Sequence, residues 1–219
     1  MNRKLKILGV GLLAVIATSA LAAASSSAET GGHFVSDGVH TTISSTDDLV
    51  HLVRFSTDQG TPIECTTESY SGTTEGLTVT QVTIAPQYKE CLTQGQASHT
   101  ATVDIGGCTY RLTIANLSQF DNTVHLHCPT GVAGAVITHP NCTMRIPPQT
   151  PSGGVVYTGI TEFGKHAFTV DVTARNITTH YEGGICIFLG TTHTSTLNGS
   201  VIVSGRAANG TQVNITATG

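Results

Sequence analysis

The stretch 166–174, HAFTVDVTA, alternates apolar and polar side chains with period two. In an extended strand, successive side chains point to opposite faces of the sheet. This strand therefore has one apolar and one polar face, which is typical of an antiparallel sheet that covers a core on one side. The apolar side chains are Phe168, Val170, Val172 and Ala174.

Similar Thr-, Val- and Ile-rich segments recur between Gly, Asn and Pro residues, and runs with helical spacing are missing after the N-terminal segment. We therefore expect an all-β protein, an antiparallel β-sandwich stabilised by disulfides. In segment 76–85 the apolar phase changes between Val79 and Val82, which predicts a β-bulge. The Asn209-Gly210 pair predicts a tight hairpin before a final strand.

Residues 1–28 have the features of a secretory signal peptide. Basic residues precede an apolar run over 7–17, and small residues suited to cleavage follow. The run is shorter than the roughly 20 residues of a membrane span. We expect cleavage after Ala28, within the window 22–29, and a secreted, extracellular chain 29–219 with no membrane span.

The segment 147–154, PPQTPSGG, is the densest cluster of strand-breaking residues. It divides the exported chain into 29–146 and 155–219. The sequence leaves open whether these are two packed β lobes or parts of one sandwich, although short and evenly spaced strands favour a single sandwich.

All six cysteines lie in the exported part, and an even number in an oxidising compartment predicts three disulfides. In 123–130, TVHLHCPT, the pleat puts Cys128 on the apolar face, and Cys108 lies on the apolar face of the strand before it. A hairpin brings these two together. The same argument pairs Cys65 with Cys91, which flank the preceding hairpin. Cys142 and Cys186 then remain, and we expect them to bridge the two parts of the chain. The predicted pairs are Cys65–Cys91, Cys108–Cys128 and Cys142–Cys186.

His125 and His127 share the opposite, polar face of the same strand. Adjacent imidazoles can bind zinc or copper, but a site needs at least a third ligand, and no spacing in the sequence selects one. Because motifs such as HExxH and CxxC are missing from the sequence, solvent-facing histidines are the favoured interpretation, with a metal site at His125 and His127 as the alternative.

The scattered charges and the missing catalytic motif count against nucleic-acid binding and against a common class of hydrolase. The chain has 10 Lys and Arg against 14 Asp and Glu, and those after the signal are scattered singly, so we expect no nucleic-acid partner. A Gly-x-Ser-x-Gly nucleophile turn is missing. No cofactor is indicated. A secreted hydrolase with an unrecognised active site stays an alternative.

Several motifs together resemble a group of uncharacterised secreted β-rich proteins of soil actinobacteria: CTTESYSGTTEGLTVT, GGCTYRLTI, VHLHCPTG, CTMRIPPQTPSGGVVYTG and GSVIVSG. The resemblance implies a bacterial secreted protein and carries over no site residues. We expect a non-catalytic binding or cell-envelope-associated module that recognises a cell-surface, glycan or protein ligand through loops and polar strand faces. An extracytoplasmic metal-binding protein is the other alternative.

Overall fold

The computed structural model describes residues 31–38, 40–46, 52–58, 62–94, 99–115, 122–140, 142–184 and 192–218. The expected signal peptide therefore lies outside the described residues. Within the described residues the regular structure is entirely β. No helix in these ranges is long and apolar enough to cross a membrane.

The strands follow one another along the chain with short connections. They are β1 (His33–Ser36), β2 (Thr42–Thr46), β3 (Val53–Thr57), β4 (Ile63–Thr73), β5 (Thr78–Val79), β6 (Gln81–Thr93), β7 (Thr100–Asp104), β8 (Thr109–Thr113), β9 (Thr123–His127), β10 (Ala135–His139), β11 (Cys142–Ile146), β12 (Ser152–Glu162), β13 (Lys165–Gly184), β14 (Thr192–Arg206), β15 (Gln212–Val213) and β16 (Ile215–Thr218).

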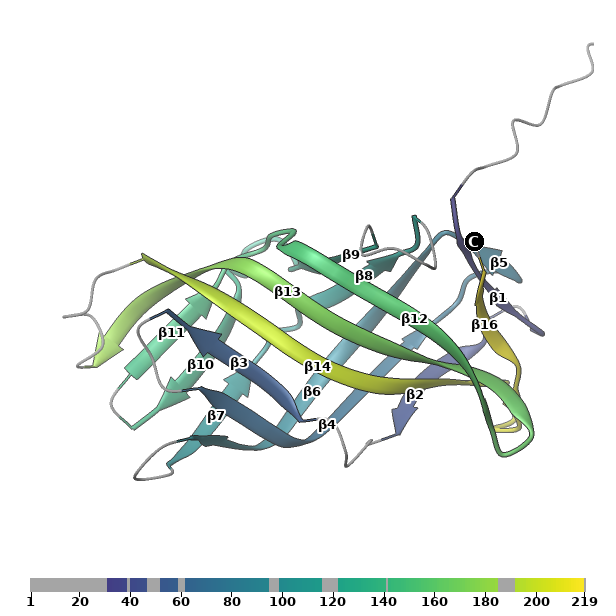
Figure 1. Cartoon of the computed structure of the whole chain (residues 1–219), viewed down its shortest axis with the longest axis horizontal. Helices are drawn as coiled ribbons and strands as arrows, with labels where there is room; N and C mark the ends of the chain where they lie inside the picture. The colour runs from purple at the N-terminus through teal and green to yellow at the C-terminus, as the bar shows by residue number, and fades with distance from the viewer. Residues whose placement is uncertain are drawn as a thin grey trace, which may run out of the picture.

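Antiparallel sheets pack together around one apolar interior, as the alternating pattern predicts (Figure 1). The 13-stranded main sheet also curls until its pairings return to their starting point, in the order β3–β14–β13–β11–β10–β7–β6–β4–β3. The two halves of the sandwich are thus joined by hydrogen bonds along both edges. This closure leaves few free strand edges along that path.

The strand at 166–174 confirms the predicted faces. It forms part of β13, where Phe168, Val170 and Ala174 are at most 2 % exposed, whereas Asp171 is exposed. The segment 76–85 differs from the prediction. It contains no bulge at the phase change but a strand break at Thr80: β5 before the break pairs with β1, and β6 after it pairs with β4. The phase changes because the chain passes from one sheet to another.

A three-stranded sheet of β16, β1 and β5 lies at one end of the molecule, near the C-terminus (Figure 1). Its main anchor is Phe34, which is 1 % exposed and contacts the rings of Tyr157 and Phe168 at centroid distances of 5.3 and 5.7 Å. Such aromatic contacts bury much apolar surface and favour tilted or edge-on geometry. This end of the interior is therefore closed by aromatic packing.

Three breaks between strands adjoin one another in the main sheet. They are the segments 105–108 between β7 and β8, 128–134 between β9 and β10, and 147–151 between β11 and β12, and we call them the seam. Position 134 in the seam requires a glycine, because a Cβ there would lie 2.1 Å from the carbonyl oxygen of Ile146. The breaker-rich segment 147–154 leads the chain from β11 to β12, which pair with different parts of β13. β12 begins inside this segment, at Ser152.

The strands on either side of that breaker share one hydrogen-bonded sheet. β11 pairs with β13, and β2 and β3 both pair with β14. The segments 29–146 and 155–219 are therefore interleaved through their hydrogen bonds. The turn at Asn209-Gly210 joins β14 to β15, with Gly210 at φ 81°, as the hairpin prediction requires.

Candidate functional site

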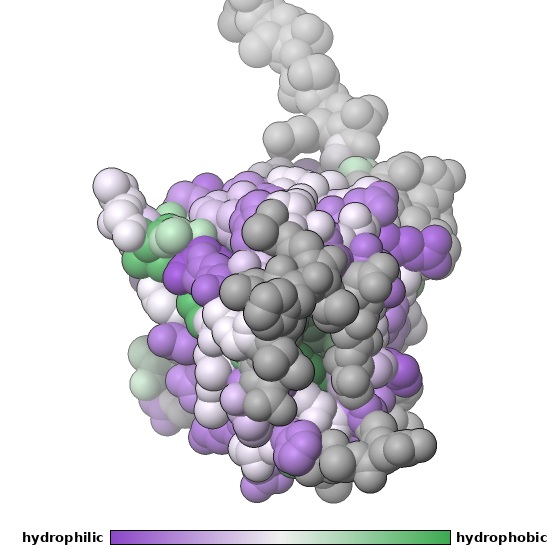
Figure 2. Space-filling model, turned by 90° about the vertical axis from the view of Figure 1, so that its left-hand side faces the viewer, coloured by the Kyte–Doolittle hydropathy of each residue, from purple (hydrophilic) through white to green (hydrophobic). Residues whose placement is uncertain are grey.

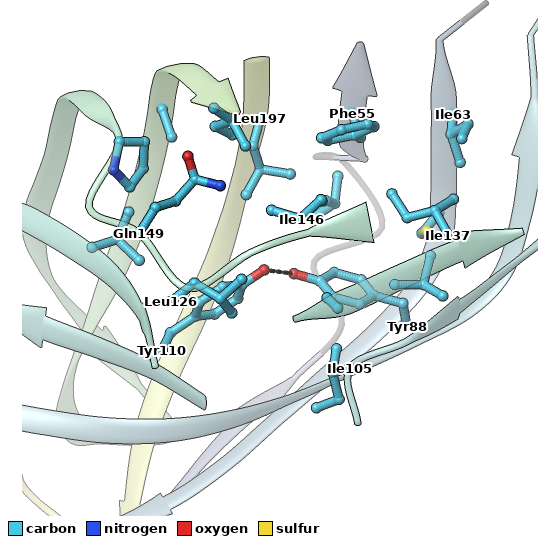
Figure 3. Close-up of a pocket in the computed structure, with 18 residues that line it drawn as sticks. Phe55, Ile63, Tyr88, Ile105, Tyr110, Leu126, Ile137, Ile146, Gln149 and Leu197 are labelled. Carbon is cyan, nitrogen blue, oxygen red and sulfur yellow. Dashed lines mark hydrogen bonds between the residues drawn. The ribbon is translucent and has the colours of Figure 1, made fainter. Parts of the chain in front are cut away.

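An apolar cavity lies inside the closed main sheet, beside the seam (Figure 3). The space free of protein atoms is about 730 Å³ when the open solvent at its mouth is included, and the centres of water molecules fit in about 70 Å³ of it. Its wall is built from inward-facing side chains of strands all around the ring, among them Phe55, Ile63, Leu126, Ile137, Ile146 and Leu197.

The cavity is formed where the strand breaks leave the interior incompletely filled. Ile105, Gln149 and Pro151, which line it, all belong to the seam. A buried water needs two to four polar partners, and an apolar lining offers few of them. Because each water centre needs roughly 10–15 Å³, the space suits several disordered waters or one small apolar group. An apolar group would be the more favourable occupant.

Two tyrosines bring polar groups to the cavity wall. The hydroxyls of Tyr88 on β6 and Tyr110 on β8 lie 2.6 Å apart and form a hydrogen bond (Figure 3). Pairing satisfies part of the hydrogen-bonding capacity of each hydroxyl and lowers the cost of burying it. The pair therefore leaves the wall largely apolar.

Gln149 contributes the third polar side chain and closes the seam. Its Nε2 donates to the carbonyl oxygen of Thr178 at 2.9 Å, and the Thr178 N–H donates to its Oε1 at 2.7 Å. Its backbone forms a bridge with Leu126 on β9. β11 pairs with β13 as far as His180, and β12 pairs with it from Arg175. Between them, the Gln149 side-chain amide forms the two hydrogen bonds to Thr178 that a neighbouring strand would otherwise form.

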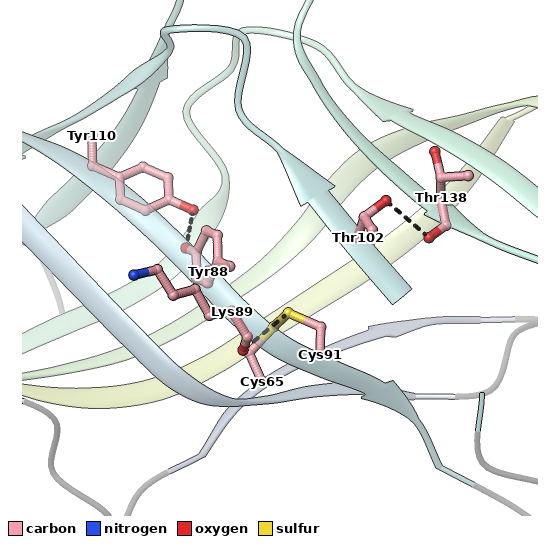
Figure 4. Close-up of a disulfide and its surroundings, with 7 residues drawn as sticks. All are labelled: Cys65, Tyr88, Lys89, Cys91, Thr102, Tyr110 and Thr138. Carbon is pink, nitrogen blue, oxygen red and sulfur yellow. Dashed lines mark hydrogen bonds between the residues drawn. A yellow bond between two sulfur atoms is a disulfide. The ribbon is translucent and has the colours of Figure 1, made fainter. Parts of the chain in front are cut away.

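The two disulfides that the structure describes have the pairing predicted from the pleat. Cys65–Cys91 joins directly opposed residues of β4 and β6, and Cys65 lines the cavity (Figure 4). Cys108–Cys128 joins two segments of the seam beside β8 and β9. Cys142 is also disulfide-bonded. Its predicted partner, Cys186, lies outside the described residues, so that pair stays a prediction.

The histidines of the sequence motif lie outside the cavity. His125 and His127 project from the outer face of β9 with ring centroids 6.2 Å apart, and Thr150 Oγ1 lies 2.6 Å from His125 Nδ1. In the described part of the chain no three His, Cys, Asp or Glu side chains gather in a way that could hold a metal ion. The structure brings the two predicted ligands together and supplies no third among these residues.

An Asp–His pair lies elsewhere, at the end of the molecule where β13 and β14 begin their pairing. Asp58 Oδ1 is 2.8 Å from His193 Nδ1, and the His193 ring stacks on Tyr181 at a centroid distance of 4.3 Å. Ser195, two residues along the strand, shares a 2.7 Å hydrogen bond with Thr179. None of these residues is among the described residues that line the cavity.

Sequence reasoning missed the cavity and the role of Gln149. The alternation correctly marks which side chains face inward, but it gives no measure of how completely they fill the interior. Gln149 stands in a Pro-rich segment whose only local signal is that it breaks strands. Comparison with known protein families, curated proteins and solved structures found no match.

Proposed function

We propose that the protein is an exported, non-catalytic binding protein that holds a small apolar ligand, or the apolar tail of a larger one, in the interior cavity. The observation that carries the proposal is an almost wholly apolar space enclosed by a closed sheet. Ligand sites in proteins are mostly apolar concavities with few polar groups, and this cavity has that character. The expectation of recognition by loops and polar faces is thereby replaced by a more specific site.

The lining also supports binding over hydrolysis. Hydrolysis needs a nucleophile, a base and an oxyanion donor close to one reacting atom. Among the described residues that line the cavity there is no Ser, His, Asp or Glu. A ligand seated there would meet chiefly alkyl and aromatic surface. Export is supported by the two described disulfides, which persist in oxidising compartments, and by the signal-like N-terminal sequence.

Benzene is a suitable probe, because it is small and apolar and binds in cavities lined by Leu, Ile and Phe side chains. Methyl NMR spectra of the oxidised protein should shift in a saturable manner on benzene addition, at Ile137 and Leu197 in particular. Binding to the folded state alone should also stabilise it, by about 1.4 kcal/mol at ten times Kd. Unchanged methyl spectra at saturating benzene would overturn the proposal.

Two variants and a control sharpen this test. Ala135→Leu adds a side chain to the cavity wall and should abolish the benzene-dependent shifts, whereas Leu197→Ala enlarges the space and should permit a larger ring such as naphthalene to bind. Ala208→Leu is the control: it makes the same Ala-to-Leu substitution on an exposed turn, and this variant should bind benzene as the wild type does. Equal binding by Ala135→Leu would place benzene elsewhere and contradict the proposal.

A further inference from the structure

The outer face of β8 and β9 gathers positive and titratable side chains. Arg111 is directly opposite His125 in the antiparallel pairing, and Thr109 is opposite His127. The intervening residues Leu112, Val124 and Leu126 point inward and are buried. Since side chains alternate along each strand, the guanidinium and both imidazoles share the solvent-facing side.

Among the residues that the structure describes, Arg111 has no acidic partner on this face. In the ranges that the structure describes, ion pairs join Arg54 to Glu64 and Arg145 to Glu182, but no carboxylate lies within ion-pair distance of Arg111. Such a cation next to two imidazoles is electrostatically unfavourable whenever these are protonated, because like charges that face each other across a sheet repel. An anion would relieve this repulsion.

The same arrangement argues against a metal ion. A divalent cation bound by His125 and His127 would lie beside the Arg111 guanidinium, and the described residues provide no carboxylate or thiolate to offset the combined charge. Metal ligands are usually anionic or neutral groups held by further acceptors. The pair of histidines therefore suits an anion better than the cation that the His-x-His spacing suggests.

We propose that Arg111, His125 and His127 form a binding site for a phosphate group or a similar oxyanion on the outer face of β8 and β9. The Arg111 fork can donate two hydrogen bonds to one oxyanion, and each protonated imidazole can add one. The Thr150 hydroxyl engages His125 Nδ1, which leaves Nε2 of that ring to bind a ligand. Thr109, opposite His127, supplies a neighbouring hydroxyl.

Anion binding at this site should depend on pH. Desolvation, followed by the charges of Arg111 and His127, lowers the pKa of His125 below its ordinary value. The charged groups that face it are Arg111 from β8 and His127 from β9 itself, whereas the adjoining segment 147–151 carries none. Farther away, Lys89 and Glu90 lie on β6, and Glu75 lines a shallow groove that extends to Thr109. Phosphate should therefore bind more tightly as the pH falls and the His125 imidazole becomes protonated.

The test is a titration of histidine side-chain NMR signals with and without inorganic phosphate, at constant ionic strength in the disulfide-intact protein. Bound phosphate should raise the pKa of His125, because binding and protonation are linked, and should shift the ring signals of His127. Arg111→Gln should raise the pKa of His125 in the absence of phosphate and weaken phosphate binding about tenfold or more. Arg175→Gln, which removes an exposed arginine from β13, should leave both results unchanged.

Two outcomes would overturn the proposal. One is a phosphate titration that leaves the pKa of His125 and the ring signals of His127 unchanged in the wild type. The other is equal phosphate affinity in Arg111→Gln and the wild type. A parallel zinc titration tests the competing interpretation, a metal site at His125 and His127. Saturable zinc binding that is lost in His127→Ala and strengthened in Arg111→Gln would show a cation site and would also overturn the proposal. The benzene test concerns the opposite face of these strands, so its result is independent.

Discussion

Gln149 connects its own segment, 147–151, to two strands that are distant in the sequence, β9 and β13. Its backbone bonds to Leu126, and its side chain bonds to the backbone of Thr178 and, at 3.1 Å, to the carbonyl oxygen of Pro147. A backbone group that loses its partner in a partly buried place costs free energy, since water reaches it only in part. The hydrogen bonds between the seam and Thr178 of β13 therefore come from the Gln149 side chain.

Replacing this side chain should destabilise the protein measurably. Gln149→Leu keeps the approximate volume but leaves the N–H and C=O of Thr178 without their side-chain partners. We expect the free energy of unfolding to fall by about 1–3 kcal/mol in urea denaturation. Gln87→Leu, on the exposed face of β6, is the matched control and should change it by less than about 0.5 kcal/mol. Similar values for the two variants would refute the role given to Gln149.

Two phenylalanines offer a second comparison at the residue scale. Phe34 is 1 % exposed within the aromatic cluster, and Phe163 is 86 % exposed at the turn between β12 and β13. Phe34→Ala should lower the free energy of unfolding by about 3–5 kcal/mol, because it removes buried surface and leaves a cavity. Phe163→Ala should change it by about 0.5 kcal/mol or less. If Phe34→Ala unfolds at the same denaturant concentration as the wild type, Phe34 does not anchor the three-stranded sheet.

Histidines should make stability depend on pH. Desolvation is the main cause that lowers the pKa of His125 and of His139, and His99 adds to the effect at His139. The unfolded chain then binds more protons at these two histidines than the folded one, so their contribution to stability is fully present above pH 6.5 and is lost as the pH falls below that value. Urea denaturation at a series of pH values should show this decline. A smaller decline is expected in the double variant His125→Gln/His139→Gln, and an undiminished one would contradict the assignment.

At the scale of elements, the hairpin of β8 and β9 is held at one end by a covalent bond and at the other by a hydrogen bond. Cys108–Cys128 closes the end at the seam, and the hydroxyls of Thr113 and Thr123 lie 2.7 Å apart at the far end. A disulfide acts mainly on the unfolded chain, whereas an exposed hydrogen bond contributes little net free energy.

These two links should differ clearly in their contribution to stability. Cys108→Ala/Cys128→Ala should lower the free energy of unfolding by about 3 kcal/mol for a loop of this length. Thr113→Val/Thr123→Val removes the cross-strand hydrogen bond of the same hairpin and should cost about 1 kcal/mol or less. Chemical denaturation of both double variants gives the comparison, and a cysteine variant as stable as the wild type would contradict the expectation.

For the whole molecule, the closed path of pairings predicts cooperative unfolding. β13 and β14, which follow the segment 147–154, lie between β11 and β3, which precede it, so each part loses hydrogen-bond partners if the other unfolds. Far-UV circular dichroism and tyrosine fluorescence should therefore report one coincident transition, the latter without interference since the chain has no Trp. Two separated transitions would indicate independent lobes.

Much of the local structure follows from the sequence because a strand's pleat is a local property. The alternation in 166–174 correctly separates Phe168 from Asp171, and the same rule pairs Cys108 with Cys128. The register that this disulfide fixes also puts Arg111 opposite His125, so the cluster on the outer face could have been deduced from the sequence. Attention to the His-x-His spacing alone suggested a metal instead.

The closed ring, the cavity and the seam could not be deduced in this way. They depend on pairings between remote strands, such as β3 with β14, and on the bridge that Gln149 makes between β9 and β13. The free energy of such contacts depends on how whole strands fit together, and no short stretch of sequence carries that information. The sequence by itself determined the all-β class, the faces of the strands and two disulfide pairs. The tertiary structure alone decided that the sheet closes around an apolar space, because closure is a property of all its strands together.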